Sequence, residues 1–289
     1  MKNIKALMFV LCVLVASSVL NSCKKEKTEA KTDLLYDVEV EGNQVKFTVK
    51  TEGVSGQKWD FGDGETSTDA NPTHTYPGKG KYVPTLVATV NGVNAEASTV
   101  LRIAKSTPVK LNDNSLADWD AVTKDVIPLG SSKGIFNKVK LDYDGNYIYL
   151  YAEMVAKKSD GVIFDFYIDA DNNPATGLLT GTFKDGGYDI LLEGPLLDKV
   201  FDTYYFIGDD QTNFGNYTVQ SIAEAYTLGT VKEEGGVVKF EARLARGKLK
   251  GLTGTGMRIG IQAIKNDWSE TLGNAPDEEA SSYFLDMSE

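Results

Sequence analysis

The chain has few of the residues on which many enzymes and most disulfide-rich proteins depend. Its 289 residues include two cysteines, one histidine and three tryptophans. Cys12 lies inside an N-terminal apolar run, so the chain beyond that run contains only Cys23. A single cysteine excludes an intramolecular disulfide and a cysteine-based zinc site. The sequence also has no GxSxG, HExxH or Cys–His arrangement, which argues against the common hydrolase mechanisms.

Positive charge is also scarce, because the formal net charge is −11 at pH 7. An acidic chain without a basic cluster argues against nucleic acid as a partner and against a polybasic membrane patch. The same composition suits calcium, which prefers clustered carboxylates. Beyond the first 22 residues, no apolar run is long enough to cross a bilayer as a helix.

The N-terminus has the organisation of an export signal. Lys2 and Lys5 precede an apolar run at 7–15, which is too short to span a membrane. Small residues and the segment VLNSC follow, ending at Cys23. This segment resembles the lipobox of bacterial lipoproteins, which implies a signal peptide over 1–22 and acylation of Cys23. An ordinary secretory signal cut elsewhere, or a short membrane anchor, is the alternative.

Residues 23–33 are predicted to form a flexible tether, because the run KKEKTEAKT is charged and lacks large apolar side chains. The segment Lys24-Lys25-Glu26 loosely resembles the export signal of surface lipoproteins of Bacteroidota. The resemblance implies a protein that is lipid-anchored in the outer membrane and faces the cell exterior.

Residues 34–104 have the pattern of short strands joined by turns. Val45, Phe47 and Val49 alternate with polar residues, as in a half-buried strand. The runs WDFGDG at 59–64, PTHTY at 72–76 and GKY at 80–82 follow in order. They resemble the PKD domain, which implies an immunoglobulin-like β-sandwich acting as a spacer. A catalytic or metal-binding role for His74 is the alternative to a packing role within that sandwich.

After a linker over 105–109, residues 110–289 are predicted to form a second, larger domain. Strand-like runs such as YIYLY at 147–151 and VIFDFYI at 162–168 alternate with Gly, Asn and Asp turns, and no long stretch has helical periodicity. The pattern predicts an antiparallel β-sandwich or jelly roll. The whole chain is therefore expected to be all-β.

Three segments of this domain resemble the family 9 type of carbohydrate-binding module and its relatives. They are LNDNSLADW at 111–119, DYDGNYIY at 142–149 and IDADNNPATG at 168–177, the last followed by GYD at 187–189. The resemblance implies a β-sandwich that binds a glycan without catalysis.

The third segment also predicts a metal site. Asp169, Asp171 and Asn173 place oxygen side chains in one turn, where they can converge on a hard cation. Asp189 or Asp185 could complete the shell. The expected ion is a structural Ca²⁺, and no organic cofactor is expected. A solvated Asx turn is the alternative.

The candidate ligand-binding residues are aromatic and amide side chains, since flat rings stack on the apolar face of a pyranose. Trp268 and Asn266 lie in a polar loop, and a second cluster follows Tyr204 and Tyr205 along the chain. This cluster contains Phe214 and Tyr217. Packing within strands is the alternative for each aromatic residue.

Together these patterns predict a surface lipoprotein that binds a polysaccharide or oligosaccharide, with the PKD domain as spacer. Its expected partners are the glycan, the membrane and an outer-membrane uptake complex. The alternatives are an adhesive or structural protein that binds another protein, and a glycoside hydrolase, which needs only two suitably placed carboxylates.

Overall fold

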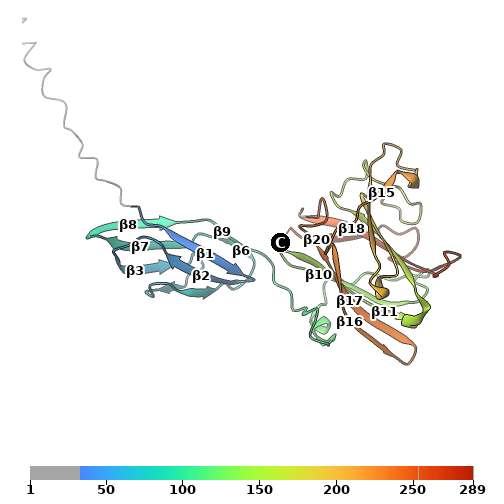
Figure 1. Ribbon diagram of the computed structural model, residues 1–289, viewed down its shortest axis with the longest axis horizontal. Coiled ribbons are helices and arrows are strands. Elements are labelled where there is room, and N and C mark those ends of the chain that lie inside the picture. Colours follow the sequence, from blue (N-terminus) through green and yellow to red (C-terminus); the bar gives the residue numbers. More distant parts are fainter. Residues whose placement is uncertain (1–32, 253, 289) are drawn as a thin grey trace, which may run out of the picture. The chain divides into compact units, whose positions relative to one another are not determined.

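Strands form nearly all the regular structure of this chain in a computed structural model that describes residues 33–252 and 254–288 (Figure 1). The only helices in this part are short 3-10 turns, so the prediction of an all-β protein is confirmed. Among the described residues, no helix has the length and apolar character needed to cross a bilayer. The predicted signal peptide, Cys23 and nearly all of the tether lie outside the described residues.

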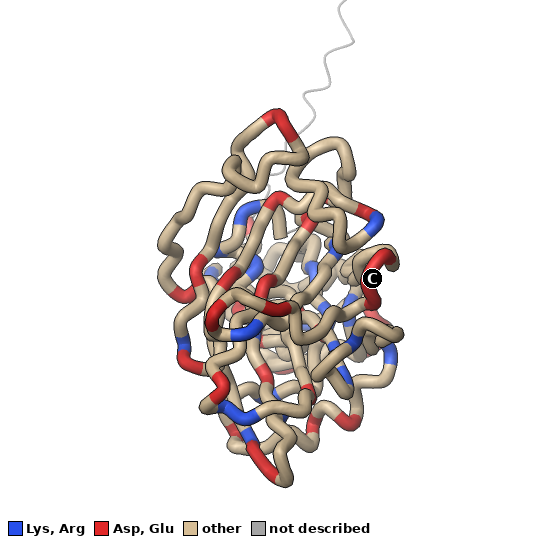
Figure 2. The backbone as a smooth tube through the Cα atoms, turned by 90° about the vertical axis from the view of Figure 1, so that its right-hand side faces the viewer, with Lys and Arg blue, Asp and Glu red and all other residues tan. Residues whose placement is uncertain are grey.

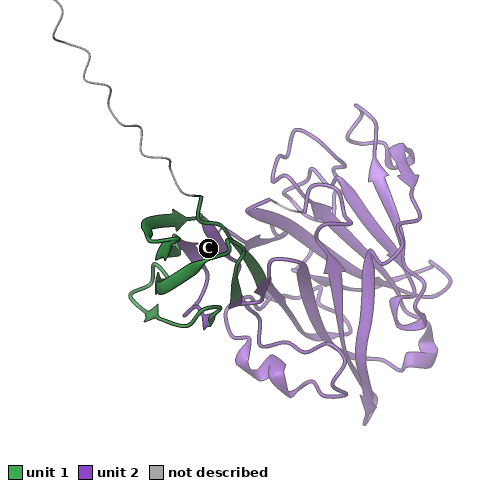
Figure 3. Cartoon of the chain, turned by 60° about the vertical axis from the view of Figure 1, so that its left-hand side comes forward, with its two compact units in different colours: residues 1–39, 46–73, 83–100 green, residues 40–45, 74–82, 101–289 purple. Residues whose placement is uncertain are grey.

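Spatial proximity divides the chain into two compact units (Figure 3). Within the described part, the first contains the chain up to Glu39 and residues 46–73 and 83–100. The second contains residues 40–45, 74–82 and the chain from Leu101 onward. Segments 40–45 and 74–82 thus group with the second unit, and the predicted limits 34–104, 105–109 and 110–289 stay predictions.

The region before residue 105 consists of short strands in three sheets. The larger two have the orders β1-β2-β5 and β4-β3-β7-β8, and β6 pairs with β9. The bounds are β1 (Tyr36–Glu41), β2 (Gln44–Val49), β3 (Val54–Asp60), β4 (Thr66–Ser67), β5 (Thr73–Thr75), β6 (Gly80–Tyr82), β7 (Thr85–Val90), β8 (Val93–Ser98) and β9 (Leu101–Ile103).

Aromatic side chains fill the interior of this region. The rings of Phe47 and Trp59 lie 5.1 Å apart, and Phe61 packs on Phe47 at 5.4 Å. The indole N–H of Trp59 donates to the carbonyl oxygen of Asp69. His74 lies in β5 and packs edge-on against the ring of Tyr76.

Residues beyond the linker form two antiparallel sheets. The four-stranded sheet has the order β10-β11-β17-β16, and the seven-stranded sheet has the order β15-β14-β13-β12-β18-β19, with β20 paired to β18. The strands are β10 (Phe136–Tyr143), β11 (Tyr147–Val155), β12 (Ile163–Asp169), β13 (Ile190–Gly194), β14 (Asp202–Phe206), β15 (Tyr217–Val219), β16 (Tyr226–Glu234), β17 (Val237–Ala245), β18 (Gly256–Ile264), β19 (Thr271–Ala275) and β20 (Tyr283–Asp286). The 3-10 turns are η1 (Ala117–Ala121), η2 (Lys158–Asp160), η3 (Leu196–Asp198) and η4 (Phe214–Asn216).

The two sheets pack face to face around one apolar core, which confirms the predicted sandwich. Alternate residues of β12, beginning with Phe164 and Phe166, enter this core. The ring of Phe164 lies 5.5 Å from Phe240 of β17, and Phe166 packs against Phe201. Because strands of both sheets contribute, the core fixes the orientation of the opposite face of β12.

A second, smaller cluster covers the outer face of the four-stranded sheet. Trp119 of η1 is 1% exposed and packs on Tyr151 of β11. Its indole N–H donates to Oε2 of the buried Glu241 at 2.9 Å. The other oxygen of Glu241 accepts the backbone N–H of Thr230 at 3.0 Å. Trp119 therefore has a structural role.

Replacing Trp119 with Phe tests this role. The substitution Trp119→Phe keeps an aromatic ring but leaves Glu241 Oε2 buried without its donor, so the free energy of unfolding should fall by about 1–3 kcal/mol. Urea denaturation measures the change. Trp268→Phe is the matched control, because Trp268 is 54% exposed and its loss should change stability by less than about 0.5 kcal/mol. Equal effects of the two substitutions would contradict the structural role.

Candidate ligand and cation site

The alternation of side chains along β12 determines which of its residues lie on the outer face of the seven-stranded sheet. While Phe164, Phe166 and Ile168 enter the sandwich core, Asp165, Tyr167 and Asp169 face the other way. Part of this face is covered by the segment between β12 and β13, which contributes Leu178, Phe183 and Tyr188 to a cluster with Tyr167 and Leu191. Every residue of β12 is consequently buried, including two aspartates.

Three carboxylates meet where β12 ends and β13 begins. One oxygen from each of Asp169, Asp171 and Asp189 lies within 4.8 Å of the others. Asp169 and Asp189 are brought together because Ile168 and Ile190 are paired in the sheet. Asp169 is 1% exposed, and its Oδ2 is buried without a hydrogen-bond partner.

Burial makes this arrangement electrostatically costly. The pKa of Asp169 is raised to about 6, chiefly by desolvation and in addition by the charges of the neighbouring Asp189 and Asp171. Burial likewise raises the pKa of Asp189 to about 6, with Asp171 contributing to the rise. A bound cation would relieve both the repulsion and the lost hydration.

Backbone amides hold the carboxylates in place. The N–H of Asn173 donates to Asp169 Oδ1 at 3.2 Å and to Asp171 Oδ1 at 2.9 Å. The N–H of Ala170 donates to Asp189 Oδ2 at 3.0 Å. The side-chain oxygen of Asn173 accepts the N–H of Ala175, so this side chain stabilises the turn in which it lies.

The structure also distinguishes between Asp185 and Asp189, the two candidates for the remaining metal ligand. Arg258 of β18 lies 3.4 Å from Asp185 and donates to the side-chain oxygen of Asn172 at 2.9 Å. Asp185 is thereby paired with a cation of the protein, and Asp189 joins the cluster. Hard oxygen donors at this separation, one of them unpartnered, fit a Ca²⁺ ion.

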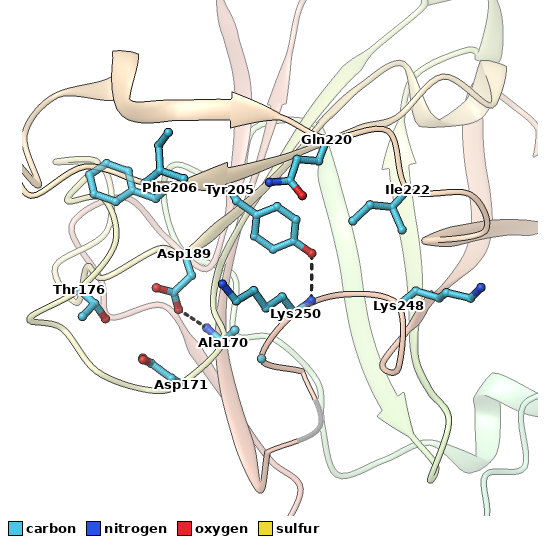
Figure 4. Close-up of a pocket in the computed structure, with 12 residues that line it drawn as sticks. Ala170, Asp171, Thr176, Asp189, Tyr205, Phe206, Gln220, Ile222, Lys248 and Lys250 are labelled. Carbon is cyan, nitrogen blue, oxygen red and sulfur yellow. Dashed lines mark hydrogen bonds between the residues drawn. The ribbon is translucent and has the colours of Figure 1, made fainter.

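A pocket of about 550 Å³ opens beside the cluster (Figure 4). Asp171 and Asp189 line it on one side, together with Thr176. The end of β14 and the segment that follows β17 supply the other walls. Its lining residues are Ala170, Asp171, Thr176, Asp189, Tyr205, Phe206, Ile207, Gln220, Ile222, Lys248, Lys250 and Gly251.

The predicted aromatic residues from Tyr204 to Tyr217 lie in different environments. Tyr205 is 8% exposed, belongs to the core and accepts the backbone N–H of Lys250 at 2.9 Å. Tyr204 and Tyr217 are half-buried on the outer face, and Tyr217 donates its hydroxyl hydrogen to the carbonyl of Tyr188. Phe214 of η4 is exposed and packs against Tyr217. Of these four, only Tyr205 lines the pocket.

Trp268 and Asn266 lie elsewhere on the sandwich, in the hairpin between β18 and β19. Trp268 is exposed and has a left-handed backbone with φ of 63°. The acid cluster lies at the other end of β18, because Asp169 is the cross-strand neighbour of Arg258. Arg258 lies six residues before the end of β18, where the hairpin begins. Six extended residues span roughly 20 Å. The structure therefore does not bring Trp268 and Asn266 together with the pocket.

A row of polar residues crosses the outer face and was not expected from the sequence. Cross-strand pairing aligns Asp202, Glu193, Asp165, Gln262 and Asn274 on five neighbouring strands. The pKa of Asp165 is raised to about 7, chiefly by burial and in addition by the charge of Glu193. The sequence feature that could have indicated this row is a single acid or amide inside an otherwise apolar strand, such as the Asp in VIFDFYI. Phe206, Gln220 and Lys250 of the pocket carried no comparable signal.

The raised pKa of Asp165 predicts a pH-dependent stability. The folded protein holds this proton up to about pH 7, whereas an unfolded chain releases it near 3.8, so unfolding becomes easier as pH rises through this window. Asp165→Asn removes the effect. Between pH 5 and pH 8 the free energy of unfolding of the parent should therefore fall by roughly 2–3 kcal/mol relative to that of the variant, as measured by urea denaturation. A stability difference that is the same at both pH values would contradict the burial of an ionisable group here.

Comparison with known proteins identifies the N-terminal region. Residues 34–104 match the model of the PKD domain. The PKD1 domain from Vibrio cholerae metalloprotease PrtV is 31% identical in sequence, with 24% of this chain and 93% of that chain covered at a TM-score of 0.23. A solved structure of carbohydrate-binding modules from the β-sandwich superfamily is 13% identical in sequence. The alignment covers 89% of this chain and 100% of that chain, at a TM-score of 0.27.

A curated relative is much longer than this chain. Collagenase ColA of Clostridium perfringens (strain 13 / Type A) is 29% identical over 209 residues, which make up 68% of this chain. The chain spans 18% of that collagenase. The predicted resemblance to the PKD domain is confirmed by the family model that matches residues 34–104.

Proposed function

We propose that the chain is a non-catalytic glycan-binding protein whose larger sandwich holds a sugar in the pocket between Asp171 and Phe206. The observation that carries this proposal is an aromatic ring and several oxygen and nitrogen groups around one pocket of about 550 Å³. A pocket of this size suits a small ligand or one end of a longer chain. The sequence resemblance to family 9 modules supports the same function.

The pocket has the chemistry that sugar recognition requires. Phe206 is half-buried and packs edge-on against Tyr217, and the part of its ring that remains exposed can contact the apolar face of a pyranose. Gln220 and Lys250 are exposed lining residues that can exchange hydrogen bonds with hydroxyl groups. Single sites of this kind bind weakly, and several chains on one surface would retain a polysaccharide by multivalency.

A structural Ca²⁺ is part of the proposal. Held by Asp169, Asp171 and Asp189, it would join the segment after β12 to the start of β13 and so stabilise one wall of the pocket. No organic cofactor is needed for binding.

The carboxylates favour binding over hydrolysis. Glycosidases place two carboxyl groups about 5–5.5 Å or 6.5–9.5 Å apart, on either side of the scissile bond. The acids of the cluster have oxygens within 4.8 Å of one another, and all three accept backbone N–H groups of Ala170 or Asn173. This spacing suits a shared cation better than a glycosidic bond.

The proposed setting is the outer membrane, with acyl chains on Cys23 as anchor and the PKD domain as spacer. A partner uptake complex would then receive the captured polysaccharide. Figure 2 shows acidic positions distributed along the backbone with lysines and arginines interspersed. The formal net charge of −11 gives no support to nucleic-acid binding, which depends on neutralising phosphates with positive charge.

Protein binding is the second candidate function. One observation favours it, the 29% identity to a protein named a collagenase over 209 residues. In that case the sandwich would act as an adhesive module for a protein ligand, and collagen is the first ligand to test.

Paired substitutions locate the glycan site. Phe206→Ala removes the ring of the proposed pocket and should weaken retention by the best-binding polysaccharide about tenfold, as expected for a lost stacking contact. Trp268→Ala is the matched variant, because it removes an exposed ring that does not line the pocket, and it should leave the affinity unchanged. Affinity electrophoresis in gels containing cellulose derivatives, xylan, mannan or pectin measures both.

The outcomes separate the candidate functions. Loss of affinity in Trp268→Ala alone would move the site to the hairpin that the sequence indicated. No retardation by any polysaccharide, together with binding to immobilised collagen, would favour the adhesive function. Release of reducing sugars from a bound glycan would instead identify a hydrolase.

Lipid anchoring has its own test. Cells fed labelled palmitate should incorporate the label into the parent chain, and Cys23→Ala should abolish incorporation because the acylated thiol is gone. The measurement is label in the immunoprecipitated protein, with fractionation of the outer membrane alongside. Equal labelling of parent and variant, or none in either, would contradict the anchor.

A further inference from the structure

We propose that the cation held by Asp169, Asp171 and Asp189 binds the sugar directly, using open coordination positions that face the pocket. This inference rests on the proposed function and gives the ion a second role besides its structural one. The ligand class is a sugar that can offer two adjacent oxygens, either vicinal hydroxyls or the carboxylate of a uronic acid.

The first step of the argument is that this cluster is a cation site and not a chance group of acids. Asp169 is 1% exposed, and its Oδ2 makes no hydrogen bond in the described structure. This atom belongs to a carboxylate whose other oxygen is already oriented by the N–H of Asn173. A buried, unpartnered carboxylate oxygen among two further acids needs a positive partner.

The second step concerns the charges of the protein around the cluster. Arg258 is next to Asp169 in the sheet, but its guanidinium binds Asp185, Asn172 and the carbonyl of Ser282. Lys250 lines the same pocket, where it is one positive charge beside a cluster of three carboxylates. The positive charge that the cluster lacks is therefore best supplied by an ion.

The third step concerns the direction in which such an ion is open. Asp169 lies on the sheet side of the cluster and is buried, whereas Asp171 is exposed and Asp189 half-buried. The latter two line the pocket of about 550 Å³. Ca²⁺ accepts six to eight oxygens, and three carboxylates leave several positions for other donors. Water would fill those on the pocket side, and a ligand that displaces water needs paired oxygens.

The fourth step is the shape of the pocket around that open side. Figure 4 shows Asp171, Asp189 and Thr176 on the same side of the pocket as Phe206. A pyranose whose ring lies on Phe206 can thus turn one edge toward the carboxylates. With Ca²⁺ bound, two sugar oxygens on that edge would complete the shell of the ion.

The first part of the experiment measures cation binding alone. Calorimetric titration of the purified full chain with Ca²⁺ should show a site that Asp171→Asn weakens about ten- to a hundredfold, as expected for a lost charged contact. Asp185→Asn is the matched control, since this acid is nearby but paired with Arg258, and it should bind Ca²⁺ as the parent does. Asp171 is exposed, so thermal unfolding of its variant should match the parent in EDTA. Absence of a site in the parent would overturn the inference.

The second part asks whether the sugar touches the ion. The site is loaded with Tb³⁺, a luminescent substitute for Ca²⁺, and luminescence lifetimes in H₂O and D₂O report the water molecules bound to the ion. Cellohexaose, xylohexaose and trigalacturonate are then added in turn. The oligosaccharide that binds should displace bound water from Tb³⁺. Displacement by a neutral oligosaccharide would indicate coordination through hydroxyl groups, and displacement by trigalacturonate alone would indicate coordination through a carboxylate.

The outcomes distinguish this inference from the proposed function. A sugar that binds equally well in EDTA, or binds without changing the hydration of Tb³⁺, overturns direct coordination and leaves glycan binding in place. Binding that requires Ca²⁺ and displaces ion-bound water supports the inference. If calcium binds but neither these oligosaccharides nor the polysaccharides in the gels do, the proposed function fails, and the inference fails with it.

Discussion

The alternation of side chains along β12 is the constraint on which the rest of the larger domain depends. Phe164, Phe166 and Ile168 are required in the sandwich core, so Asp165, Tyr167 and Asp169 must occupy the outer face of the same strand. A shift of one residue would place two carboxylates in the core. The apolar packing between the sheets thus determines where the charged groups of the domain lie.

Burial of these charged groups on the outer face follows from the segment between β12 and β13. Its apolar residues cover Tyr167 and Leu191, and in doing so they remove the neighbouring aspartates from water. The desolvated carboxylates have raised pKa values, and one oxygen each of Asp165 and Asp169 is left without a partner. Functional sites are common where such costs are tolerated. The proposed cation and the adjoining pocket give this cost a function at Asp169.

Much of the fold was predictable because its signals are local. Alternating apolar residues and Gly, Asn or Asp turns mark the strands, and the DADNN turn places Asp169 and Asp171 within two residues of each other. The sequence named Asp189 as the fourth metal residue but held no reason to prefer it to Asp185. That reason is Arg258, which lies far along the chain and is brought next to these acids only by strand pairing. The same holds for the polar row, which exists only in the register of five strands, and for the distance of Trp268 from the pocket.

Hydrogen exchange of the full chain with and without a bound oligosaccharide tests the central claim, glycan binding in this pocket, most directly. The account predicts protection in the segments that form the pocket, namely 170–176, 205–207 and 248–251. Protection confined to the hairpin around Trp268, or none anywhere under saturating ligand, would contradict it.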